Sequence, residues 1–130
     1  MVDLTWVGEK KNKLRRAGTH LARVFRRHPR IIVSMTSYPA RINTVHFAIR
    51  TLLAQKRLPD KIILWLCESD FPNREDDLPE SLKDVLWHDV EVRWVNNDLK
   101  PHKKYYWALQ EFKDDYVITT DDDLLYRNTM

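Results

Sequence analysis

The sequence contains very little glycine. Only Gly8 and Gly18 occur among its 130 residues, and both lie in the first 30. The phosphate-binding loops of P-loop proteins and of dinucleotide-binding Rossmann domains need several glycines at fixed spacing. Neither loop motif occurs anywhere in this chain, so a nucleotide would have to be bound by other kinds of residues.

Cysteine and long apolar runs are also scarce. The single cysteine, Cys67, excludes an intrachain disulfide framework and a Cys-rich zinc site, and its apolar neighbours predict a buried thiol. No apolar stretch approaches the roughly 20 residues that span a bilayer, and the N-terminus lacks the apolar core of a signal peptide. We therefore expect a cytoplasmic protein.

Basic charge is concentrated at the start of the chain. The first 30 residues carry nine Lys or Arg and two acidic residues, whereas the other 100 carry 13 basic and 17 acidic residues. This difference predicts a basic leader over 1–29 and a mildly acidic domain over 30–130. Because the leader accounts for the isoelectric point of about 9.0, that value does not indicate nucleic-acid binding, and we expect none.

The leader has the pattern of an amphipathic helix over residues 10–27. Apolar side chains recur at helical spacing between lysines and arginines, and His28-Pro29 ends the pattern. One interpretation is peripheral contact with the anionic inner face of a membrane. The other is a helix that packs its apolar side on the domain and leaves its basic side in solvent.

The remaining residues alternate between strand and helix patterns. Strands are predicted over 31–36, 61–67, 90–95 and 116–120, and helices over 43–56, 79–87 and 102–112. The first two strands show no polar alternation, as expected for strands that are buried on both faces. Such an alternation is typical of right-handed crossovers and a mostly parallel sheet, so we predict a Rossmann-like α/β fold.

Three consecutive aspartates, Asp121, Asp122 and Asp123, follow the last predicted strand. Ligands of parallel α/β sheets bind at the carboxyl ends of the strands, and adjacent carboxylates repel unless a cation or donors offset their charge. In an extended segment Asp121 and Asp123 would point to the same side, where they could hold Mg²⁺ or Mn²⁺ against a diphosphate. The alternative is a solvated acidic loop that caps a helix.

The segment from Ile31 to Asn128 resembles the N-terminal half of GT-A glycosyltransferases, in particular family-2-like bacterial enzymes that build polysaccharides. The resemblance is carried by "IIVSMTSYPARI", "KIILWLCE", "KPHKKYYWAL" and "YVITTDDDLLY". It implies a nucleotide-binding half-sheet with four strands in the order 3-2-1-4, in which the aspartate motif ends the fourth strand. The matching family members continue well beyond that motif, so a truncated domain is expected.

The same resemblance implies site residues. Asp123 would bind the metal, and Asp121 would share it or contact the ribose. Glu68 would hydrogen-bond uracil, and Tyr38 would stack on the base. Because adjacent helical residues point about 100° apart, one of Lys103 and Lys104 should face the ribose and diphosphate. The expected nucleotide-sugar-binding residues are Thr36, Ser37, Tyr38, Arg41, Glu68, Lys103, Lys104, Asp121 and Asp122, with Asp121 and Asp123 as metal ligands.

The expected reaction is metal-assisted transfer of a sugar from a nucleoside diphosphate sugar, preferably UDP-linked, to a hydroxyl of a glycan or lipid-linked acceptor. The chain ends at Met130, seven residues after Asp123. We therefore expect a fragment without acceptor elements, and no catalytic residue can be identified. A non-catalytic nucleotide-binding or membrane-peripheral module is the alternative.

Two further expectations concern other chemistry. A haloacid-dehalogenase-type phosphohydrolase needs an aspartate after the first strand. This chain has Met35-Thr36-Ser37 there, which argues strongly against that class of enzyme. His46, His88 and His102 lack the spacing of metal ligands, so structural roles are expected for them.

Overall fold

The computed structural model describes residues 28–87 and 89–130. The predicted amphipathic helix over 10–27 and His88 therefore lie outside the described residues, as does nearly all of the predicted leader. In the part that is described, no helix is long and apolar enough to cross a membrane.

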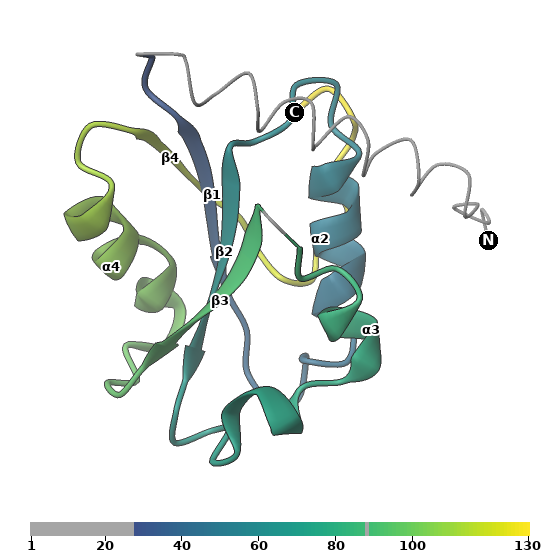
Figure 1. Ribbon diagram of the computed structural model, residues 1–130, viewed down its shortest axis with the longest axis vertical. Coiled ribbons are helices and arrows are strands. Elements are labelled where there is room, and N and C mark those ends of the chain that lie inside the picture. The colour runs from purple at the N-terminus through teal and green to yellow at the C-terminus, as the bar shows by residue number, and fades with distance from the viewer. Residues whose placement is uncertain (1–27, 88) are drawn as a thin grey trace.

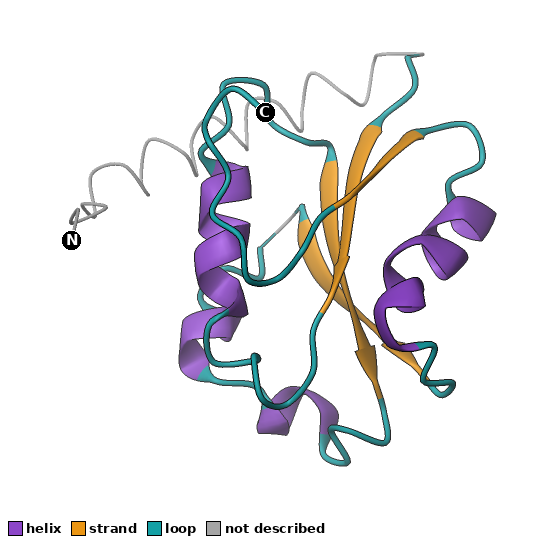
Figure 2. Cartoon of the chain, turned by 180° about the vertical axis from the view of Figure 1, so that it is seen from behind, coloured by secondary structure: helices purple, strands orange, loops and turns teal. Residues whose placement is uncertain are grey.

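Four parallel strands form one sheet in the order β3-β2-β1-β4, which confirms the predicted α/β fold and its strand order. Helices α2 and α3 cover one face of the sheet and α4 covers the other (Figures 1 and 2). The strands are β1 (Ile31–Thr36), β2 (Lys61–Cys67), β3 (Val90–Val95) and β4 (Tyr116–Thr119). The α-helices are α2 (Val45–Leu53), α3 (Glu80–Lys83) and α4 (Lys103–Glu111), with 3₁₀ turns η1 (Arg74–Asp77) and η2 (Lys100–His102).

The strand predictions are accurate and the helix predictions are too long. The bounds of β1, β2 and β3 agree with the sequence pattern, and β4 ends one residue early. Helix α2 stops at Leu53, three residues before its predicted end, and the backbone N–H of Lys56 donates instead to the carbonyl of Asn128 at 2.9 Å. Helix α3 is only four residues long because the chain continues from it in turns with shorter-range hydrogen bonds.

The core lies on both faces of the sheet, and strand β2 contributes to both layers. Ile62, Leu64 and Leu66 face α2 and α3, whereas Ile63 and Trp65 face α4. Each fully buried aliphatic side chain stabilises the fold by roughly 1.5–3 kcal/mol. Because β2 is buried on both faces, its sequence shows no polar alternation. They also account for Cys67, which is fully buried as predicted.

The two described histidines that were predicted to be structural lie on helices or their caps. His46 is buried on α2 beside Phe47, and this burial lowers the pKa of its imidazole. His102 precedes α4 and hydrogen-bonds Tyr105 one turn later.

Candidate functional site

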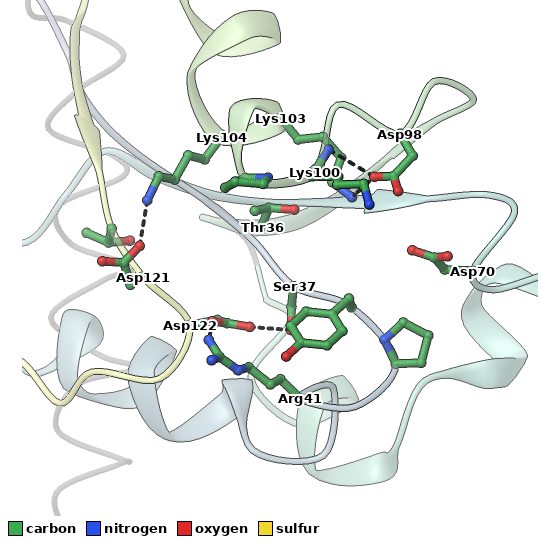
Figure 3. Close-up of a pocket in the computed structure, with 14 residues that line it drawn as sticks. Thr36, Ser37, Arg41, Asp70, Asp98, Lys100, Lys103, Lys104, Asp121 and Asp122 are labelled. Atoms are coloured by element: carbon green, nitrogen blue, oxygen red, sulfur yellow. Dashed lines mark hydrogen bonds and ion pairs between the residues drawn. The ribbon is translucent and has the colours of Figure 1, made fainter.

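A cavity of about 490 Å³ opens at the carboxyl end of the sheet. Its walls come from the loops after β1, β2 and β3, from the first turn of α4 and from the end of β4 (Figure 3). This volume falls within the range of small-molecule sites. Eight of the predicted nucleotide-sugar-binding residues line it, namely Thr36, Ser37, Tyr38, Arg41, Lys103, Lys104, Asp121 and Asp122.

Two of the predicted site residues, Asp123 and Glu68, do not line this cavity. The carboxylate of Glu68 pairs with Arg74 at 2.5 Å because the 3₁₀ turn η1 carries that guanidinium back toward the end of β2. Glu68 instead lines a separate, open cavity of about 550 Å³ beside Trp65 and Arg93.

The middle aspartate of the triplet points into the protein. Asp122 is 7% exposed and accepts hydrogen bonds from Ser37 Oγ at 2.7 Å and from Arg41 Nη1 at 2.9 Å. The predicted alternation assumed an extended chain, but β4 ends at Thr119 and Asp122 lies in a turn. Asp122 therefore joins the β4 end to the loop after β1.

The flanking aspartates remain half-exposed and contact different cations. Asp121 Oδ1 accepts from Lys104 Nζ at 2.5 Å, and Asp123 Oδ2 lies 3.0 Å from Arg41 Nη1. Their side chains are 53% and 49% exposed. The backbone N–H of Asp121 also donates to the Tyr126 hydroxyl at 2.8 Å, which fixes the start of the triplet. No pattern in the sequence indicates this role of Tyr126.

The loop after β1 positions Arg41 by its backbone. Arg41 N–H donates to the Tyr38 carbonyl at 2.9 Å, and the Arg41 carbonyl accepts from Thr44 and Val45 at the start of α2. The guanidinium lies 5.5 Å from the centre of the Tyr38 ring, a cation–π arrangement. Its hydrogen bond to Asp122 raises the pKa of Arg41.

Both lysines at the start of α4 line the cavity, where at least one was expected from helix geometry. Lys103 is buried, with 3% of its side chain exposed, and its ammonium contacts Asp98 at 2.8 Å. This hydrogen bond is the main reason that the pKa of Asp98 is lowered. Lys104 points the other way, toward Asp121, so the two ammonium groups lie on opposite sides of the cavity (Figure 3).

Three charged lining residues were missed in the sequence: Asp70, Asp98 and Lys100. Each aspartate lies three residues after the end of a strand, Asp70 after β2 and Asp98 after β3. The rule that ligands bind at the carboxyl ends of parallel strands would have identified both. Lys100 has a left-handed backbone with φ 52°, and its N–H donates to Asp98 Oδ1 at 3.0 Å.

One group of described side chains is compact enough to hold a metal ion, and it does not include the triplet. Cys67, Asp70 and Asp98 offer ligand atoms within 4.8 Å of one another. Cys67 Sγ contacts Ser69 Oγ at 3.1 Å, and Asp98 already carries the Lys103 ammonium. These contacts satisfy both side chains without an ion.

Comparison with models of known protein families gives no match to this chain, and a search of curated proteins gives no significant match either. The function must therefore be argued from the chemistry of the cavity.

Proposed function

We propose that this cavity binds a nucleoside diphosphate sugar and that the chain is the donor-binding half of a metal-dependent glycosyltransferase. The observation that carries the proposal is the convergence of three kinds of group on one cavity. Tyr38 provides an exposed aromatic ring, Lys100 and Lys104 provide two ammonium groups, and Asp121 provides a half-exposed carboxylate. Asp123 does not line the cavity, but its half-exposed carboxylate contacts Arg41, which does.

The base is assigned to the wall formed by the loops after β1 and β2. Tyr38 is 45% exposed and offers a ring face for stacking, while Asp70 on the facing loop offers a carboxylate to an imide N–H (Figure 3). Asp70 thus takes the role that the resemblance gave to Glu68. A UDP-linked donor remains the preferred one because uracil carries such an N–H.

The diphosphate is assigned to the first turn of α4. Lys104 and Lys100 line this part of the cavity, and the N-terminus of a helix favours anions. Buried Lys103 supports them indirectly, because its ion pair with Asp98 holds the preceding loop.

The divalent cation is assigned to the flanking aspartates. Asp121 and Asp123 engage Lys104 and Arg41 through one oxygen each, and carboxylate oxygens are the ligands that Mg²⁺ and Mn²⁺ prefer. When bound, the cation would offset the charge of the departing diphosphate. Asp122 is a positioning residue in this scheme, because its contacts to Ser37 and Arg41 are internal.

The acceptor is proposed to be a hydroxyl of a glycan or a lipid-linked sugar, and the reaction is proposed to occur in the cytoplasm at or near the membrane. The buried free thiol of Cys67 is consistent with a reducing compartment.

Calorimetric titration of UDP, with and without Mn²⁺, tests this proposal. We compare the chain with D121N/D123N and with D76N/D84N, a control that removes two exposed carboxylates elsewhere. We expect metal-dependent binding that weakens at least about tenfold in D121N/D123N only. Equal binding by all three proteins, or no binding by the folded chain, would contradict the proposal.

A further inference from the structure

The aspartate triplet is neutralised by two basic side chains that differ in how firmly they are held. Arg41 contacts Asp122, which is 7% exposed and also accepts from Ser37. Lys104, whose side chain is 21% exposed, contacts Asp121, whose side chain is 53% exposed. An ion pair with a half-exposed carboxylate that has no second side-chain donor stabilises a fold only modestly. The Lys104–Asp121 pair can therefore be exchanged for other partners at little cost, whereas the Arg41–Asp122 pair cannot.

Lys104 combines a fixed backbone with a mobile ammonium group. Its carbonyl accepts a hydrogen bond from Ser34 Oγ, which in turn accepts from the buried Trp65 indole at 2.8 Å. This chain of contacts attaches the first turn of α4 to β1 and β2. The lysine stem has four rotatable bonds, so Nζ can move within the cavity while the helix stays in place.

We propose that Lys104 is an exchangeable counter-ion that couples cation binding to nucleotide binding. In the ligand-free chain it neutralises Asp121, and in the occupied site it turns to the diphosphate. This inference rests on the proposed function, because it requires that a divalent cation and a nucleoside diphosphate share the cavity.

The coupling follows from the charges around Asp121. An ammonium and a divalent cation on one carboxylate repel each other strongly at separations near 4 Å. Lys104 therefore opposes the binding of a cation alone. A diphosphate that arrives with the cation gives Lys104 a new anionic partner, and this opposition disappears. Cation and nucleotide consequently bind more tightly together than separately, and the coupling is reciprocal.

A purely structural ion pair makes a different prediction. If Lys104 only attached α4 to the end of β4, its loss would lower stability and would weaken both ligands or neither. An exchangeable counter-ion produces shifts of opposite sign, because its removal helps the cation alone and harms the nucleotide. Opposite shifts cannot arise from partial unfolding, which weakens every ligand.

The experiment compares K104M with K61M, a control that loses one lysine from the Glu91 ion pair at the amino end of β2. Mn²⁺ binding is measured alone, and UDP binding is then measured at saturating Mn²⁺. We expect K104M to bind Mn²⁺ about two- to fivefold more tightly and UDP about tenfold more weakly. K61M should bind Mn²⁺ and UDP with the affinities of the unmodified chain, and K104R should do the same.

Each alternative outcome separates the two proposals. Metal-dependent UDP binding by the unmodified chain, with unchanged or weaker Mn²⁺ binding by K104M, would overturn the role of Lys104 and leave the proposed function intact. Absence of Mn²⁺ and UDP binding from every folded variant would overturn both. If K104M does not fold, K104Q gives the same comparison with a polar side chain.

Discussion

At the amino end of the sheet, charged side chains connect neighbouring strands, whereas at the carboxyl end they surround a cavity. Arg30 binds Asp115 across β1 and β4, with Nη2 to Oδ2 at 2.6 Å. Lys61 binds Glu91 across β2 and β3 at 3.0 Å. The cavity that borders Ile31 at this end measures only about 60 Å³, against about 490 Å³ at the other end.

The difference follows from the parallel arrangement of the strands. Each crossover returns the chain to the amino end, so residues that precede the strands are close to their neighbours and can pair directly. At the carboxyl end the loops lead to helices on opposite faces of the sheet (Figure 2), and the cavity of about 490 Å³ lies among these loops. Charges at the amino end therefore support the fold, whereas those at the carboxyl end are available to a ligand.

The largest expected effect comes from the layer that both ends share. Leu64 is fully buried in β2, and L64A should lower the free energy of unfolding by about 3 kcal/mol through lost burial and an internal cavity. Urea denaturation measures this loss. Where L64A is still folded, its affinity for UDP should equal that of the unmodified chain. If L64A kept the stability of the unmodified chain but bound UDP more weakly, the distinction between scaffold residues and site residues would be contradicted.

Removal of the buried carboxylate charge at the carboxyl end should affect both properties. In D122N, the Ser37 hydroxyl and the Arg41 guanidinium lose a charged acceptor, and we expect a loss of about 1–2 kcal/mol in unfolding free energy. UDP binding should weaken as well, because Arg41 is no longer held. D123N removes an exposed contact of the same arginine and should change stability by less than about 0.5 kcal/mol. Equal destabilisation by both substitutions would contradict the assignment of Asp122 as the positioning residue.

Loss of the amino-end pair should affect stability alone. D115N should lower the free energy of unfolding by about 1 kcal/mol without changing UDP affinity, since Arg30 is half-exposed and its pair is partly screened. The hydrogen bond from Arg30 lowers the pKa of Asp115, so this stabilisation is complete above the unfolded-state pKa of about 3.9. It is lost as the pH falls through the lower folded-state pKa.

The difference in stability between the unmodified chain and D115N should therefore stay constant from pH 7 to about pH 5 and shrink below about pH 4. Urea denaturation across this range measures it. A difference that persists at the acidic limit would show that the substitution acts through packing rather than charge.

The last prediction concerns two residues with a strained backbone conformation. Lys100 and Arg74 both have φ 52°, a left-handed conformation that glycine adopts without steric cost, but only Lys100 lines the cavity. K100G and R74G should each raise the thermal midpoint slightly, by the equivalent of about 0.5–1 kcal/mol. Only K100G should weaken UDP binding. A similar loss of affinity in R74G would extend the site to η1.

The fold could be predicted from the sequence more accurately than the candidate site. Strands such as Lys61–Cys67 could be predicted to the residue because burial on both faces leaves a continuous apolar run with clear ends. The end of α2 could not, because it depends on a hydrogen bond between Lys56 and Asn128, more than 70 residues away. Local pattern carries no information on such contacts.

The same limit applies to the aspartate triplet. Its place after a predicted strand led us to predict a site there, but the inward direction of Asp122 depends on Ser37 and Arg41 in a distant loop. The strand itself, β4, is largely exposed and not buried as its apolar sequence predicted. Asp70 and Asp98 were accessible to prediction in principle, since both follow strand ends by three residues. Lys103 was predicted as a site residue, but its burial was not, because that burial depends on how α4 packs.

Amide chemical-shift mapping of the ¹⁵N-labelled chain, titrated with UDP in the presence of Mg²⁺, tests the central claim most directly. We expect the perturbed amides to cluster in the loops after β1, β2 and β3, in the first turn of α4 and in residues 120–123, with Arg30 and Asp115 unchanged. Perturbations confined to the amino end would contradict the assignment of the ligand site to the carboxyl end of the sheet, and perturbations confined to the separate cavity beside Trp65 and Arg93 would contradict the choice of cavity.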